Sequence, residues 1–142
     1  MNHKILNGLV LKHSPLREAD EILTLWSWEE GKARVLARAV RKSSSRLRAV
    51  LAPVSWLSLQ VAPSRRLAVV VDAKVRKSYP EILKNLSHLA IVFNVFEVLM
   101  RATPDGEPNQ QVSRLLRQRR GNEIKAAKLL QKRGFPWWRQ LK

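Results

Sequence analysis

Residues 21–41 have the sequence EILTLWSWEEGKARVLARAVR, and this stretch decides the fold class of the 142-residue chain. Residues 21–28 are rich in branched and aromatic side chains, which favour a β-strand. Residues 29–32 (EEGK) are a compact turn signal, and residues 32–41 resume in extended character. The stretch therefore predicts two strands joined by a tight hairpin.

Three further segments have strand character: residues 5–13 before the hairpin, and residues 54–61 and 67–75 after it. In the last of these, one face is predicted to carry Leu67, Val69, Val71, Ala73 and Val75, with Asp72, Lys74 and Arg76 on the other. Five short strands within about 75 residues favour a small closed barrel, because closure leaves no exposed strand edge.

After residue 79 the apolar period becomes helical. Pro80 suits a first helical position, and apolar side chains recur at three- and four-residue spacing as far as Met100. One helix or a closely kinked pair is expected there. Further helices are expected after Asn109 and after Asn122, which can act as N-caps. The fold class is thus α+β, with a five-stranded barrel in residues 1–79 and a small helical region in residues 80–142.

The chain is strongly basic, with 27 Lys and Arg against 11 Asp and Glu, for a net charge of +16. Residues 1–79 carry 15 basic and 6 acidic side chains, and residues 80–142 carry 12 and 5. Both parts share the excess, so a basic tail on a neutral domain is excluded. Phosphate backbones are the usual partners of such a charge, because basic side chains release their condensed counterions.

Several function classes find no support in the sequence. Cys is absent, and His3, His13 and His88 are scattered, so no metal or other cofactor is expected. No Gly-rich phosphate loop or nucleophile motif is present, so we expect a binding protein and not an enzyme, without a small-molecule substrate. Glu18 and Asp20 are expected to pair with a nearby cation or to cap a turn. Without a signal-type apolar run or a membrane-spanning stretch, the chain is expected in the cytoplasm.

The strongest local signal is a basic run from Lys32 to Arg48, which holds seven cations and no acid. In an extended strand these cations alternate with small residues that point into the barrel. An ordinary surface strand mixes charge signs, so we interpret the run as a phosphate-binding surface and not as a merely solvated face. The candidate DNA-binding residues in it are Lys32, Arg34, Arg38, Arg41, Lys42, Arg46 and Arg48.

Two arginines in another loop complete this predicted surface. In an oligonucleotide-binding (OB) barrel the ligand crosses strands two and three, between the first-to-second and fourth-to-fifth loops. Here those loops hold Arg17 and the pair Arg65 and Arg66. Arg65 and Arg66 are therefore added to the candidate DNA-binding residues.

Trp26 and Trp28 share one face of the second strand, beside the basic third strand. If exposed, they would stack on bases, at about 1–3 kcal/mol each. The alternative, slightly favoured, is that they fill the core or cover a barrel end. Trp56 is expected in the core, whereas for Trp137 and Trp138 the sequence does not choose between stacking and docking.

Five motifs occur in an order that resembles the bacterial RecO family of DNA repair proteins. They are residues 11–20 (LKHSPLREAD), 25–31 (LWSWEEG), 36–47 (LARAVRKSSSRL), 51–53 (LAP) and 104–108 (PDGEP). The resemblance covers residues 5–108 well and residues 109–136 poorly. It departs at Ala39, where the family usually has Gly, and in a helical domain much shorter than the family's. The Cys cluster of some members would fall beyond the end of this chain, so zinc is not implied.

The resemblance implies an OB-fold barrel followed by a helical domain. The implied activity is binding of single- and double-stranded DNA, annealing of complementary strands and assistance in loading RecA. The implied partners are RecR and the acidic tail of the single-stranded-DNA-binding protein, in the bacterial cytoplasm at the nucleoid.

Two other functions suit the composition alone. A basic OB-fold protein bound to RNA or the ribosome would favour folded RNA over DNA. A protein adaptor would use its basic surface to recruit an acidic tail.

Overall fold

The computed structural model describes residues 2–42, 47–51 and 54–117. The elements in these ranges are β1 (Lys4–Leu16), β2 (Asp20–Ser27), β3 (Gly31–Ala37), α1 (Leu47–Val50), β4 (Ser55–Ala62), β5 (Ala68–Ser78), α2 (Pro80–Leu83), α3 (Leu86–Ala102) and α4 (Gln110–Arg117). The helix expected after Asn122, together with Trp137, Trp138 and Arg46, lies outside the described residues.

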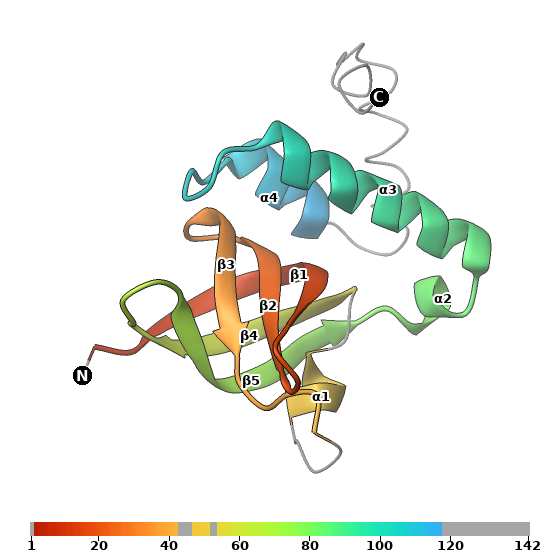
Figure 1. Ribbon diagram of the computed structural model, residues 1–142. Coiled ribbons are helices and arrows are strands. Elements are labelled where there is room, and N and C mark those ends of the chain that lie inside the picture. The colour runs from red at the N-terminus through yellow and green to blue at the C-terminus, as the bar shows by residue number, and fades with distance from the viewer. Residues whose placement is uncertain (1, 43–46, 52–53, 118–142) are drawn as a thin grey trace.

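The five strands close into one barrel in the order β1-β2-β3-β5-β4 (Figure 1). Neighbouring strands are antiparallel except β3 and β5, which run parallel where Val35 lies opposite Ala68 and Leu36 opposite Val69. The prediction of an α+β fold with a five-stranded OB-fold barrel is confirmed.

β2 is apolar on both faces because each face is buried against a different layer. Leu23 and Leu25 belong to the core inside the barrel. Trp26, on the opposite face of the strand, belongs to a second core between the barrel and the helices. The strand therefore separates two apolar layers, with the helices covering its outer face.

The alternation predicted for residues 67–75 is wrong, because β5 contains two bulges. Its pairing with β4 skips Val71 and, further along, Arg76. Each extra residue turns the side chains that follow it to the other face of the sheet. Val70 is consequently buried, whereas Val71 and Val75 are each 47% exposed.

The helical region begins with the closely spaced pair that the sequence allowed between Pro80 and Met100. α2 ends before α3 begins, and Asn85 caps α3 by accepting a 3.1 Å hydrogen bond from the backbone N–H of His88. Asn109 caps α4 as predicted, since its Oδ1 accepts from two backbone N–H groups of the first turn. In the described part of the chain, no helix is long and apolar enough to cross a membrane.

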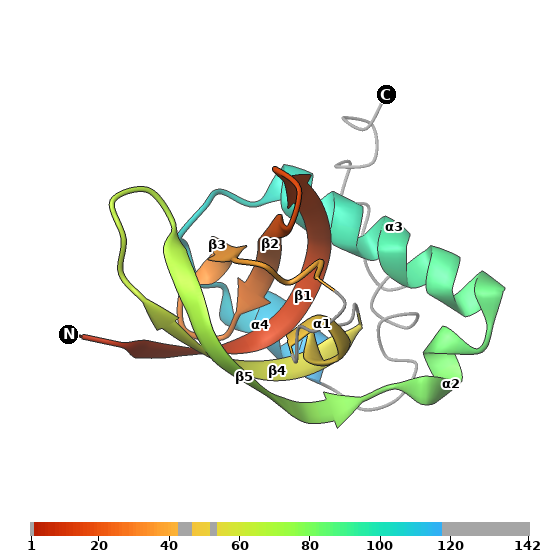
Figure 2. The same cartoon turned by 60° about the horizontal axis from the view of Figure 1, so that its bottom comes forward.

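α3 and α4 lie over the outer face of β1 and β2, as the two views show (Figures 1 and 2). The second core between these layers consists of Leu9, Leu11, Trp26, Val54, Tyr79, Ile82, Val92, Val95, Phe96, Leu99 and Leu116. Within it, the indole Nε1 of Trp26 donates a 2.9 Å hydrogen bond to the Oγ of Ser113. The helices are thus fixed to the barrel by packing and by a buried polar contact.

The β2–β3 turn is also joined to the loop between α3 and α4. The backbone N–H of Gly106 donates a 2.9 Å hydrogen bond to the carbonyl oxygen of Lys32. Gly31 has φ +71°, and a Cβ on it would lie 2.0 Å from the carbonyl oxygen of Glu107. This close approach requires glycine at position 31.

α1 packs across the opposite end of the barrel (Figure 2). Leu47 and Val50 pack against the interior core, to which Leu51 itself belongs. The helix also contacts β5. This end of the barrel is therefore closed by the segment that follows the basic run.

Candidate nucleic-acid interface

At the end of the barrel away from the β2–β3 turn, the β1–β2 turn and the segment after β3 are hydrogen-bonded to each other. The Oδ1 of Asp20 accepts from the backbone N–H of Ala39 at 2.8 Å. The backbone N–H of Arg41 donates to the carbonyl oxygen of Ala19 at 2.9 Å, and its Nη1 donates to that of Arg17 at 3.3 Å. Asp20 therefore caps a turn, which is one of the two roles expected for Glu18 and Asp20.

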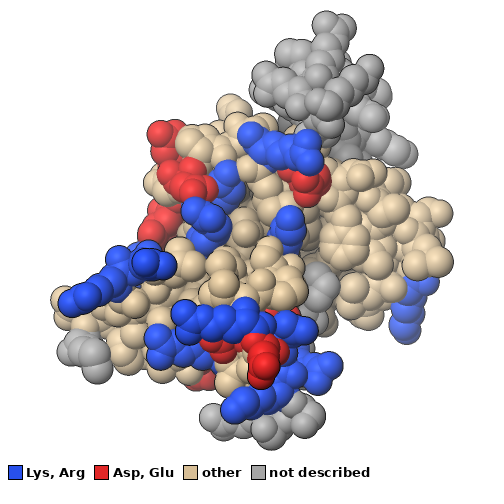
Figure 3. Space-filling view, in the orientation of Figure 1, with Lys and Arg blue, Asp and Glu red and all other residues tan. Residues whose placement is uncertain are grey.

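A group of exposed cations surrounds this junction, and we term it the basic rim. Its members are Arg17, Arg38, Arg41, Lys42 and Arg48. None of them forms an ion pair with an Asp or Glu of the described residues, although Glu18 is exposed in the same turn. Figure 3 shows Lys and Arg side chains in a band over this lower end of the barrel. Such unneutralised charge on hydrogen-bonded turns suits the binding of phosphate oxygens.

Lys32 and Arg34 lie nearer the opposite end, where the α3–α4 loop engages them. The Nζ of Lys32 donates a 2.6 Å hydrogen bond to the carbonyl oxygen of Met100 and lies 3.3 Å from Asp105 Oδ1, with the side chain 14% exposed. Arg34 stays exposed, with its Nη2 3.6 Å from Asp105 Oδ2. The ammonium group of Lys32, which was predicted to contact DNA, thus holds the α3–α4 loop in this structure, and its part in DNA binding stays a prediction.

Arg65 and Arg66 are exposed in the β4–β5 loop. Because Ala68 pairs with Val35, this loop emerges beside the middle of β3, on the left of Figure 1. The pair therefore flanks β3, as the OB-fold geometry requires, and its part in DNA binding stays a prediction.

The sequence reasoning did not assign Lys74 and Arg76 to the interface. Both are exposed on β5, which runs parallel to β3, continues past its end and contacts α1. They therefore lie on the side of the barrel that carries the basic rim. Closure of the barrel brings β5 to this position, and no local pattern in residues 68–78 could have indicated it.

The structure excludes base stacking by Trp26, which is fully buried. That prediction is wrong because the helices cover the outer face of β2, as the alternative interpretation held. Trp28 is partly buried against the same core and packs edge-on against Trp56, with ring centroids 5.9 Å apart and an interplanar angle of 76°.

Within the residues that the structure describes, no group of three or more His, Asp or Glu side chains is placed to hold a metal ion. His13 lies with its Nδ1 2.8 Å from Glu21 Oε2, which joins the ends of β1 and β2. This contact gives His13 a structural role at the junction of the two strands.

Comparison with known families supports the fold and the order of the motifs. The family described as recombination protein O N terminal matches residues 1–79. A DNA repair protein RecO from Desulforamulus reducens is 32% identical over 111 residues, covering 78% of this chain and 43% of that protein. A RecO from Prochlorococcus marinus (strain MIT 9303) is 40% identical over 103 residues, covering 72% and 38%.

Among solved structures, a chain of the S. pombe Stn1–Ten1 complex covers 72% of this chain, with 12% identity and a TM-score of 0.41. The chain spans about two fifths of the length of the curated relatives given above, 43% and 38%. The match over the whole barrel and the identity to these relatives lead to one conclusion. The chain belongs to the RecO family, whose curated members are DNA repair proteins.

Proposed function

We propose that this chain is a non-enzymatic DNA-binding protein of recombinational repair, which binds single- and double-stranded DNA and anneals complementary strands. The observation that carries the proposal is the basic rim, a set of exposed cations without ion pairs to the described acids. Family membership favours DNA over RNA as the polymer that this surface binds.

Annealing follows from charge neutralisation. Two DNA strands repel each other through their phosphates, and a surface that neutralises those phosphates lowers the repulsion. The rim suits this role because hydrogen bonds between its turns hold the backbone from which the cations project. Contacts to phosphates carry no sequence information, so strands of any sequence can be paired.

Assistance in RecA loading, and binding of RecR and of the single-stranded-DNA-binding protein, are part of the same proposal. The resemblance to the RecO family supports these partners. The proposed place of action is the bacterial cytoplasm. The relatives are more than twice as long as the region matched here.

The test is reversal of three rim charges, Arg38→Glu, Arg41→Glu and Lys42→Glu, in one variant. We expect it to lose both DNA binding and strand annealing, because phosphates would then meet carboxylates in place of cations. Annealing of complementary labelled oligonucleotides at several salt concentrations measures the activity, and fluorescence anisotropy measures the affinity.

A matched control reverses Lys4, Lys84 and Arg114 to Glu, which changes the net charge equally at exposed positions outside the rim. The control should keep most of the affinity and the annealing rate. Equal losses in the two variants would contradict the assignment of the site, because net charge alone would then explain binding.

A further inference from the structure

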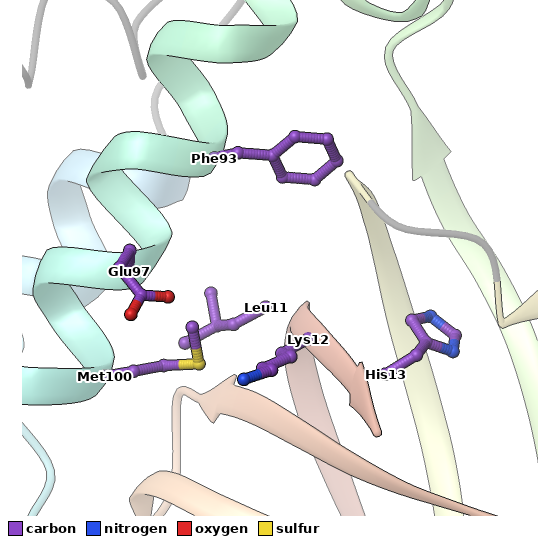
Figure 4. A pocket seen from close by; sticks show the side chains of 6 residues that line it. All are labelled: Leu11, Lys12, His13, Phe93, Glu97 and Met100. Atoms are coloured by element: carbon purple, nitrogen blue, oxygen red, sulfur yellow. The ribbon is translucent and has the colours of Figure 1, made fainter. Parts of the chain in front are cut away.

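A cavity of about 300 Å³ opens between β1 and α3. Leu11, Lys12 and His13 line it from the strand, and Phe93, Glu97 and Met100 line it from the helix (Figure 4). The two rows come from the barrel and from the helical region, so the cavity exists only where these parts pack together. Its volume lies at the lower end of the range of about 300–1,000 Å³ found for small-molecule pockets.

The cavity has an apolar lining and an exposed aromatic ring. Leu11 and Met100 provide apolar surface, and Figure 4 shows the ring of Phe93 projecting from α3 into the opening. Phe93 is 40% exposed, and its ring is supported edge-on by the buried Phe96, at 6.4 Å between centroids. A supported, partly open ring face is what stacking on a nucleobase requires.

The polar groups of the cavity suit a nucleotide. Lys12 is exposed, and Figure 4 shows its amino group directed into the cavity, where it can meet a phosphate. Glu97 is held by Arg101, whose Nε donates to Oε1 at 2.9 Å, which leaves Oε2 as an acceptor. A carboxylate oxygen accepts from base amino groups such as N4 of cytosine.

The cavity is also within reach of the basic rim. Lys12 lies in β1, and Arg17 directly follows the end of that strand. The five-residue separation between them corresponds to about 17 Å, at about 3.3 Å per residue. A few nucleotides of an extended strand cover that distance. A strand bound at the rim can therefore extend as far as the cavity.

We propose that this cavity binds one unpaired base of a single DNA strand, stacked on Phe93, while the rim holds the neighbouring phosphates. The inference rests on the proposed DNA-binding function and adds to it a site that distinguishes single strands from duplexes. A base inside a duplex is stacked and paired, so it cannot enter the cavity.

The test compares the affinity of the full chain for oligo(dC) and for an abasic deoxyribose-phosphate oligomer of the same length. We expect the wild type to bind oligo(dC) at least about 5-fold more tightly, because stacking adds to phosphate binding. Phe93→Leu keeps apolar bulk against Phe96 and removes the ring, so it should lose most of this preference. The slope of log affinity against log salt should stay unchanged, because phosphate contacts set it.

Two controls separate stacking from folding. Leu86→Ala lies on the same helix at a side chain that is 83% exposed and does not line the cavity, so it should keep the wild-type preference. Phe93→Tyr keeps an aromatic ring, so it should also keep the preference for oligo(dC). Thermal unfolding of each variant verifies that the fold is retained.

The outcomes distinguish this proposal from the proposed function. If the wild type and Phe93→Leu share the same preference for oligo(dC), the cavity does not bind a base. An alternative occupant, such as a side chain of another protein, would give this result, and only this inference would then be contradicted. If the wild type binds neither oligomer in a salt-dependent way, both the proposed function and this inference fall.

Discussion

Ala39 has φ +56°, in the left-handed region of the backbone map that residues with a Cβ rarely adopt. The residue lies in the turn after β3, where its N–H donates to Asp20 Oδ1 and fixes the conformation. The RecO resemblance places a glycine at this position in most members, and the observed backbone gives the physical reason. Alanine here retains a strain that glycine would remove.

Ala39→Gly should therefore raise the free energy of unfolding by about 0.5–1 kcal/mol. The gain is the left-handed strain, about 1–2 kcal/mol, less the extra entropy that glycine brings to the unfolded chain, about 0.4–1 kcal/mol. Urea unfolding followed by tryptophan fluorescence measures it. Ala33→Gly, inside β3, is the control and should lower stability; a loss of stability in Ala39→Gly as well would contradict the strain.

At the scale of elements, the β2–β3 turn and the α3–α4 loop form a joint between the barrel and the helices. Lys32 contributes its ammonium group and its carbonyl oxygen to the joint, and Gly31 provides the space for the backbone of Glu107. Gly106, in the facing loop, also has a positive φ of +76°, but no atom lies within 4 Å of the position of its missing Cβ. The two glycines therefore differ in packing and share the backbone requirement.

Gly31→Ala is expected to cost about 2–5 kcal/mol of stability, because it adds a clash with backbone to the left-handed strain. Gly106→Ala should cost only the strain, about 1–2 kcal/mol. Chemical denaturation of both variants gives the comparison. Equal losses at the two positions would mean that the joint is not closely packed.

The elements themselves could be predicted from the sequence, since alternation and capping are local patterns. The existence of the five strands and the cap at Asn109 needed only a few neighbouring residues. The predicted limits of the third strand were wrong, because it was expected to run through residue 41 and β3 ends at Ala37, where the Asp20-capped turn begins. The partners of the site residues could not be predicted in this way. Trp26 bonds to a serine 87 positions away, and Lys32 to a carbonyl 68 positions away, so their availability to DNA depends on the tertiary fold. The bulges in β5 likewise depend on its pairing with β4.

At the scale of the whole molecule, the net charge of +16 is unevenly placed. Figure 3 shows Lys and Arg side chains gathered over the lower end of the barrel, with a few Asp and Glu side chains among them, and a further group of Asp and Glu side chains near the α3–α4 loop at the upper left. This uneven distribution of charge would orient the molecule as it approaches a polyanion, so that the basic rim faces the polyanion.

Binding of single-stranded DNA should weaken with salt, with a slope of roughly −3.5 in log affinity against log salt if about five phosphates are engaged. Anisotropy titrations over a series of potassium chloride concentrations measure the slope. The affinity for a DNA oligonucleotide should exceed the affinity for an RNA oligonucleotide of matched sequence. A slope near zero, or a preference for folded RNA, would contradict the proposed function.

β1 and β2 have apolar side chains on both faces, and each face is covered by a different core. The same two strands therefore line both cores, and removing the layer on either side would expose apolar side chains of these strands to solvent. A barrel separated from its helices would turn Leu9, Leu11 and Trp26 into surface, and with them it would lose one side of the cavity beside Phe93. The proposed base site therefore requires the barrel and its covering helices together.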